Sequence, residues 1–238
     1  MIGLGCYRIG ETGQGGDVKS VVKSAILEHG YRHLDTARVY DNEEVIGEAI
    51  EECVAAGVPR EELYITTKLW NNMAPGEGDV FSAGFDYSDI EGSCRESMRR
   101  LRVEYLDLYL IHWMILPIDF ESEDWRVIGP PFHVVWQQME QLVKKGLVKS
   151  IGVSNCTIPM MINLLAGCEI KPAINQIEVH PYRNCSDVLR FHNKWGITLE
   201  AYCPIGGEGG WGAGGVGGNA LNDPVIAEIA AAKGKSPA

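Results

Sequence analysis

Apolar and polar positions follow two patterns that alternate along the chain. Short runs that are mostly apolar are typical of strands, and apolar residues that recur every three or four positions are typical of helices. Seven runs predict strands: IGLGCY, YRHLD, LYITTKL, LDLYLIH, VKSIGVSN, AINQIEV and ITLEAYC. Helices are expected over residues 17–28, 41–57, 90–101, 132–145, 159–166 and 187–194, with a last helix from about residue 223. Strands that alternate with helices this regularly predict a parallel sheet.

The second helix has a start signal of its own. Asp41 is followed three positions later by Glu44, which is the spacing of a capping box, in which each side chain accepts a hydrogen bond from the other residue's backbone N–H. We therefore expect Asp41 to be the N-cap of this helix.

The C-terminal ends of the predicted strands carry polar residues: Asp35, Lys68, His112, Asn155, Glu178 and Tyr202. One such residue from each of many strands is how the site of a (β/α)8 TIM barrel is built, whereas an open sheet concentrates its site at one switch point. We therefore predict a single α/β domain over residues 1–238 with this barrel fold. The pattern shows no eighth strand, so the barrel is expected to be incomplete and to keep two open sheet edges.

Composition narrows the range of partners. The 238 residues carry a formal charge of −11 and no basic cluster, which argues against nucleic acid or an anionic membrane as a partner. The sequence shows neither an apolar run of transmembrane length nor the start of a signal peptide. Seven cysteines without a C-x-x-C pair indicate reduced thiols in a cytoplasmic protein and no metal site.

Two irregular segments and a glycine-rich run stand apart from the regular pattern. Segments 71–89 and 113–131 follow strands, and in a barrel they are expected to lie over the site as substrate loops. The run GGEGGWGAGGVGG contains a G-x-G-x-x-G at residues 210–215. It follows the seventh strand and no helix begins at its third glycine, so we do not interpret it as a dinucleotide-binding fingerprint.

Asp35, Tyr40, Lys68 and His112 form a candidate proton-donating group. A lysine at an apolar strand end needs a counter-charge, and Asp35 at the end of the preceding strand is the plausible partner of Lys68. A tyrosine phenol has a reference pKa of about 10. A neighbouring ammonium is expected to lower that pKa and make Tyr40 a general acid, while His112 could orient a carbonyl oxygen.

Six segments of the chain carry recognisable signatures in order: GYRHLDTARVYDNEEVIGEAI, ITTKLW, DLYLIHW, KSIGVSN, NQIEVHPY and AYCPIG. Together they resemble the aldo-keto reductases, most closely the aldose reductase-like branch. The resemblance implies a (β/α)8 barrel that transfers a hydride between NADP(H) and an aldehyde or ketone, without metal or flavin. We further expect a monomer whose partner is a small carbonyl compound.

The resemblance also implies roles for individual residues. Tyr40 would donate the proton as hydride reaches the carbonyl carbon, and His112 would position the carbonyl. Lys68, paired with Asp35, would hold down the pKa of the tyrosine. The nicotinamide would contact Ser154, Asn155, Gln176 and Tyr202. Other parts of the cofactor would contact Cys203, Ile205 and Gly206. The apolar wall of the substrate pocket would consist of Tyr7, Trp70 and Trp113.

Structural alternatives to these roles stay open. They are a purely structural ion pair for Asp35 and Lys68, a helix cap for Ser154 and Asn155, and rim packing for Trp70 and Trp113. For the whole chain, the alternative is a nucleotide-binding sensing or interaction subunit with the same fold and little turnover.

Four departures from the family pattern limit what the resemblance implies. Met114 stands where the family usually has a proline, and the loop over residues 71–89 is longer than the family's, so the natural carbonyl substrate is not indicated. Cys203 stands where the family usually has a serine, which would weaken a cofactor contact. In the family, the residues that bind the 2′-phosphate of the cofactor lie on an eighth strand that the sequence does not show. A preference for NADPH over NADH therefore rests on the resemblance alone.

Overall fold

Seven parallel strands form one sheet in the order β1-β2-β3-β4-β7-β8-β9. They are β1 (Leu4–Gly5), β2 (His33–Asp35), β3 (Tyr64–Leu69), β4 (Leu106–Ile111), β7 (Val148–Ser154), β8 (Ile174–Glu178) and β9 (Thr198–Tyr202). The helices are α1 (Val18–Leu27), α2 (Glu43–Ala55), α3 (Ile90–Leu101), α4 (Phe132–Lys144), α5 (Ile158–Leu165), α6 (Ser186–Trp195) and α7 (Pro224–Lys233). This computed structural model describes residues 2–9, 17–70, 89–114, 118–119, 126–127, 130–206 and 220–238.

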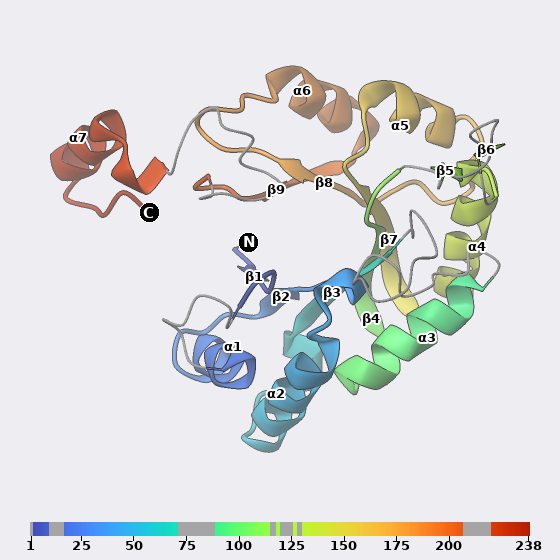
Figure 1. Cartoon of the computed structure of the whole chain (residues 1–238), viewed down its shortest axis with the longest axis horizontal. Helices are drawn as coiled ribbons and strands as arrows, with labels where there is room; N and C mark the ends of the chain where they lie inside the picture. The colour runs from blue at the N-terminus through green and yellow to red at the C-terminus, as the bar shows by residue number, and fades with distance from the viewer. Residues whose placement is uncertain are drawn as a thin grey trace.

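The sheet curves around an interior, and helices α1 to α6 lie along its outer side (Figure 1). Strands β1 and β9 are the two ends of the sheet order and face each other across the opening in Figure 1. The prediction of a (β/α)8-type barrel with seven of its strands is therefore confirmed. No helix within the described residues has the length and apolar character needed to cross a bilayer.

The predicted substrate loops and the glycine-rich run fall largely outside the described residues. Of segment 113–131, the structure describes the short antiparallel pair β5 (Ile118–Asp119) and β6 (Arg126–Val127) together with the ends of the segment. Residues 71–88 and 207–219 are not described, and these include the G-x-G-x-x-G match. The interpretation of these segments stays a prediction.

Strand β4 shows how the sequence builds the core. All six residues of LDLYLI are buried, as expected for a strand with β3 and β7 on either side, helices outside it and the barrel interior within. Its one charged residue, Asp107, is paired: its carboxylate accepts hydrogen bonds from Arg60 at 2.9 Å, Lys149 at 3.0 Å and the backbone N–H of Ile65 at 3.0 Å. All seven cysteines are free thiols, and four of them are buried.

The predicted N-cap of the second helix is wrong. Helix α2 begins after Asn42, because the short 3-10 turn η1 (Arg38–Tyr40) ends at Asp41 in a left-handed conformation with φ of 52°. The Asn42 side chain does not cap the helix either. It donates to the backbone oxygen of Cys6 at 2.8 Å and accepts from the Thr36 hydroxyl at 2.7 Å, so it ties β1 and the β2 loop together.

Gly47 is the point at which helices α2 and α3 come into backbone contact. A Cβ at this position would lie 2.1 Å from the carbonyl oxygen of Arg100 and 2.8 Å from the Cα of Leu101. We expect Gly47→Ala to lower the free energy of unfolding by about 1–3 kcal/mol, because the helices must move apart. This loss exceeds the gain in helix propensity, which is at most about 1 kcal/mol. Urea denaturation measures the difference.

Gly167→Ala is the matched control for this prediction. Gly167 follows helix α5, and a Cβ there would meet no heavy atom within 4 Å. Its φ is not in the left-handed region, so alanine is expected to leave the stability unchanged or slightly raise it. Equal stability of Gly47→Ala and the wild type would contradict the close contact.

Candidate active site

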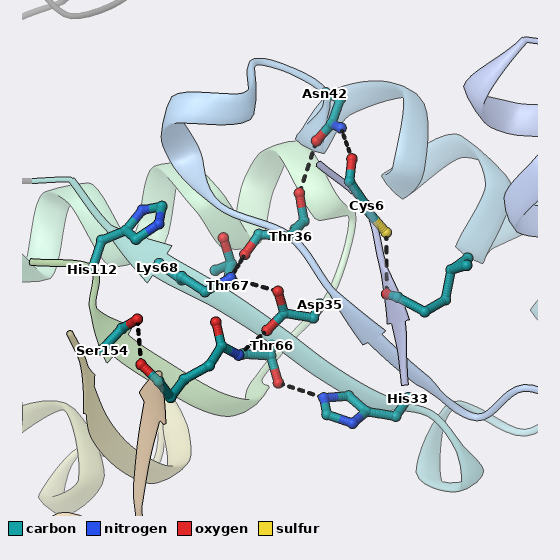
Figure 2. Close-up of polar contacts among 12 residues, drawn as sticks. Cys6, His33, Asp35, Thr36, Asn42, Thr66, Thr67, Lys68, His112 and Ser154 are labelled. Atoms are coloured by element: carbon teal, nitrogen blue, oxygen red, sulfur yellow. Dashed lines mark hydrogen bonds and ion pairs between the residues drawn. The ribbon is translucent and has the colours of Figure 1, made fainter. Parts of the chain in front are cut away.

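The C-terminal ends of β2, β3 and β4 bring the predicted proton-donating group together. These strands are neighbours and parallel, so their last residues meet at one edge of the sheet. Asp35 ends β2, Lys68 is next to the last residue of β3, and His112 directly follows β4. Tyr40 ends the η1 turn just beyond β2. Figure 2 shows Asp35, Lys68 and His112 on adjacent strands.

The predicted pairing of Asp35 with Lys68 is confirmed. The Lys68 side chain is 0% exposed, and its Nζ lies 2.5 Å from Oδ1 of Asp35 and 2.9 Å from the backbone oxygen of Thr36 (Figure 2). The second oxygen of Asp35 accepts from Nε2 of Gln176 at 2.8 Å. Burial acts to lower the pKa of Lys68, but the Asp35 carboxylate, together with Tyr40 and Glu200, outweighs it and the net pKa is raised. Lys68 is therefore an ammonium ion at neutral pH.

Tyr40 lies against this ammonium, but its pKa shifts in the direction opposite to the sequence-based expectation. Nζ of Lys68 is 5.2 Å from the centroid of the Tyr40 ring. Burial of the phenol raises the pKa of Tyr40, and the Lys68 charge lowers it by less, so the net pKa is raised. The expectation was wrong because the sequence shows the charge beside the phenol but not how much water the fold removes from it.

His112 is a neutral imidazole in this structure. Burial, with a further contribution from the Lys68 charge, lowers its pKa well below the ordinary range. Its ring lies edge-on to Tyr40, with the centroids 5.6 Å apart, and edge-on to Trp70 at 5.1 Å. Within the described residues, its buried Nδ1 has no hydrogen-bond partner. A neutral ring can donate one hydrogen bond and accept another, which suits contact with a carbonyl oxygen.

Ser154, Asn155, Gln176 and Tyr202 form a connected polar group at the ends of β7, β8 and β9. The Ser154 hydroxyl donates to the backbone oxygen of Gln176 at 2.8 Å. Asn155 has a left-handed φ of 55°, donates to the backbone oxygen of His112 at 3.1 Å and accepts from the Tyr202 hydroxyl at 2.9 Å. The helix-cap alternative is wrong, because helix α5 has Thr157 as its N-cap residue.

The three residues predicted to contact the cofactor after β9 form a tight turn. Cys203 is exposed and has a left-handed φ of 48°, and Gly206 has a φ of 74°. The backbone N–H of Gly206 donates to the oxygen of Cys203 at 2.9 Å, which leaves the Ile205 side chain exposed. The turn lies at the same edge of the sheet as Tyr202.

Two of the three predicted wall residues contact the candidate proton-donating group. The Tyr7 ring lies 4.9 Å from the Tyr40 ring, and Trp70 contacts His112 as described above. Trp113 directly follows His112 in the chain. Tyr7 is half exposed and Trp70 is partly exposed, so they present aromatic surface beside Tyr40 and His112, respectively.

Comparison with known proteins decides the family. Residues 1–216 match the Aldo/keto reductase family. The chain belongs to this family. The resemblance seen in the sequence is thus confirmed, together with the oxidoreductase class that it implied.

Individual aldo-keto reductases resemble the chain over most of its length. It is 40% identical over 222 residues to aldose reductase B of Dictyostelium discoideum, covering 87% of this chain and 66% of the relative. It is 38% identical over 223 residues to glycerol 2-dehydrogenase (NADP(+)) of Hypocrea jecorina, covering 87% of this chain and 65% of the relative. An aldo-keto reductase of Bombyx mori, solved in complex with NADP, superposes with a TM-score of 0.81 at 34% identity, over 99% of this chain and 73% of that one. The chain thus spans about two thirds to three quarters of each of these proteins.

Sequence reasoning missed one residue of the candidate site. Glu200 of β9 is in register with Gln176 of β8, and both side chains face the interior. A ring nitrogen of His33 and a carboxyl oxygen each of Asp35 and Glu200 lie within 4.8 Å of one another. Lys68 already supplies a cation to Asp35, so we assign no metal to this group. The available signal was a carboxyl group inside a strand, which is costly without a partner.

Glu178, the last residue of β8, is paired inside the rim. Its carboxylate lies 3.2 Å from Nε2 of His180 and 3.5 Å from Nη1 of Arg183. These partners account for its charge, so it is not a candidate for the reaction.

Proposed function

We propose that this chain carries the reaction centre of an NADPH-dependent reductase that transfers a hydride to an aldehyde or ketone, with Tyr40 as the proton donor. The observation that carries the proposal is the convergence of Tyr40, Lys68 and His112 at the adjacent ends of β2, β3 and β4. Carbonyl reduction needs a proton donor, a charge that stabilises the donor after it has lost its proton, and a group that holds the carbonyl oxygen. The phenol, the ammonium and the neutral imidazole can supply these three functions.

The roles follow from the charges. A carbonyl oxygen becomes negative as hydride reaches its carbon, and Tyr40 gives it the phenol proton at that moment. The phenolate that remains lies beside the Lys68 ammonium, which stabilises it. Asp35 keeps the buried ammonium charged and in place. His112, being neutral, can hold the carbonyl oxygen by a hydrogen bond without competing for the proton.

The polar group on β7, β8 and β9 fits a nicotinamide. NADPH, when bound, supplies the hydride. The amide nitrogen of Gln176 donates to Asp35, so its amide oxygen is left as an acceptor. The side-chain oxygen of Asn155 accepts from Tyr202 and has a second lone pair. Two acceptor oxygens match the two N–H groups of a carboxamide, and the Tyr202 ring supplies an aromatic face.

The relatives support the cofactor and the substrate class. One relative is named as NADP(+)-dependent and one structural neighbour was solved with NADP. The aromatic rings of Tyr7 beside Tyr40 and of Trp70 beside His112 favour a carbonyl compound with an apolar or aromatic body.

The test is the oxidation of NADPH by this chain in the presence of an aromatic aldehyde, with NADPH binding measured in parallel by fluorescence. We expect aldehyde-dependent oxidation together with formation of the alcohol in equal amount. Binding without turnover would contradict the reductase proposal and favour the nucleotide-sensing subunit. Neither binding nor turnover would contradict both.

A further inference from the structure

Glu200 places a second carboxyl group inside the barrel, behind the Asp35–Lys68 pair. Its partner in register is Gln176, whose amide nitrogen donates to Asp35 at 2.8 Å, and the Gln176 side chain acts to lower the pKa of Glu200. The amide therefore lies beside both carboxyl groups. Within the described residues, the second carboxyl oxygen of Glu200 is buried and has no hydrogen-bond partner.

Charged and titratable groups face Glu200 from three other strands. Strand β2 contributes His33 and Asp35, and β3 contributes Lys68 and Tyr64. Strand β8 contributes the uncharged amide of Gln176. This leaves one ammonium for two carboxyl groups, so ionisation of Glu200 adds a negative charge that no cation in this group balances.

The single ammonium is also the charge that acts on Tyr40. Lys68 lies 2.5 Å from Asp35 and 5.2 Å from the centroid of the Tyr40 ring, and Glu200 interacts electrostatically with it. Any negative charge added behind Lys68 offsets part of the field that favours a phenolate at Tyr40.

We infer that Glu200 is a positioning residue whose charge, acting through the buried Lys68 that it shares with Asp35 and Tyr40, sets the pH range over which Tyr40 releases its proton. The inference rests on the proposed role of Tyr40 as proton donor. Nothing in it requires Glu200 to touch the substrate.

Glu200 changes its charge near neutral pH, which is where its effect on proton release by Tyr40 would be observed. Burial, with a further contribution from Asp35, raises the pKa of Glu200 to about 7. The pKa values of the other candidates, His33 and His112, are lowered by burial, so they titrate at lower pH. We therefore expect Glu200 to give the wild type an inflection near neutral pH.

The direction of the effect follows from the charges. Above the pKa of Glu200 the added negative charge raises the pKa of Tyr40, which makes the phenol a weaker acid and slows proton donation. Glu200→Gln keeps the shape of the side chain and the contact with Gln176 but stays neutral. In the variant, kcat should therefore stay at the higher value of its acidic plateau through neutral pH. Its Tyr40 should ionise at a lower pH than in the wild type.

The experiment compares the wild type with Glu200→Gln by two readouts over a range of pH. The first is kcat for aldehyde reduction. The second is the ultraviolet titration of Tyr40 as tyrosinate, obtained by subtracting the titration of the corresponding Tyr40→Phe protein. In Glu200→Gln we expect the inflection near neutral pH to vanish, and both the alkaline limb of kcat and the tyrosinate titration to move down by about half a unit or more.

The controls separate a local from a general charge effect. Glu228→Gln makes the same change of charge on the exposed surface of α7 and is expected to match the wild type. Glu200→Thr is a second neutral variant suited to a strand, should the glutamine variant fold poorly.

Either outcome decides the inference. An unshifted tyrosinate titration in a folded neutral variant would overturn it, even if Tyr40-dependent turnover is found and the proposed function stands. If the wild type shows no turnover, the proposed function fails by itself. A shifted titration would then still support the coupling between Glu200 and Tyr40, and an unshifted one would still overturn it.

Discussion

Tyr40→Phe should lower kcat for NADPH-dependent aldehyde reduction by about 10²–10⁴-fold, the usual contribution of a positioned general acid. Phenylalanine keeps the ring contacts with Tyr7 at 4.9 Å and with His112 at 5.6 Å, so the site should hold its shape. What is lost is the proton for the carbonyl oxygen. Steady-state kinetics measures the loss, and NADPH binding should be unchanged, because the proposed nicotinamide contacts lie on β7, β8 and β9.

The matched control is Tyr31→Phe. Tyr31 lies before β2, at the opposite end of that strand from Tyr40, so loss of its hydroxyl should leave kcat unchanged.

Burial raises the pKa of Tyr40, so wild-type Tyr40 should remain a protonated donor through neutral pH. Turnover by Tyr40→Phe at the wild-type rate would show that another group supplies the proton.

The fold could be predicted from the sequence because burial of both strand faces leaves a clear pattern. The run LDLYLIH predicted β4 to within one residue, since every position of Leu106–Ile111 is buried. Strands β1 and β2 are shorter than predicted, with two and three residues. Their runs contain residues suited to strands, but a strand also needs a paired neighbour, and β1 pairs with β2 over two positions.

The ion pair of the site was predictable, and the balance of its electrostatics was not. Neither Asp35 nor Lys68 could be buried alone, so their pairing followed from the residue types. The pKa direction of Tyr40 depends on burial set against charge, and only the folded chain shows that burial prevails. Glu200 escaped notice because its inward position depends on the register between β8 and β9, which no short motif encodes.

Lys68→Met should both destabilise the protein and abolish carbonyl reduction. Lys68 is 0% exposed and Asp35 is 14% exposed, so loss of the ammonium leaves a largely buried carboxylate without its cation. Breaking such a pair typically costs about 3–5 kcal/mol of the free energy of unfolding. The phenolate left on Tyr40 after proton transfer would also lose its stabilising charge, so kcat should fall by about 10²-fold or more. Urea denaturation and steady-state kinetics measure the two effects.

Two further variants separate these effects. Lys149→Met breaks an ion pair in which the lysine is 55% exposed, and Asp107 keeps Arg60 as a partner, so the expected loss is at most about 1 kcal/mol. The double variant Asp35→Asn with Lys68→Met removes both charges, which should recover much of the lost stability, since the Asp35 carboxylate no longer lies buried without its cation. It should not recover turnover, because Tyr40 would still lack the ammonium. A stable double variant that reduces aldehydes at the wild-type rate would mean that Asp35 and Lys68 are a structural ion pair and no more.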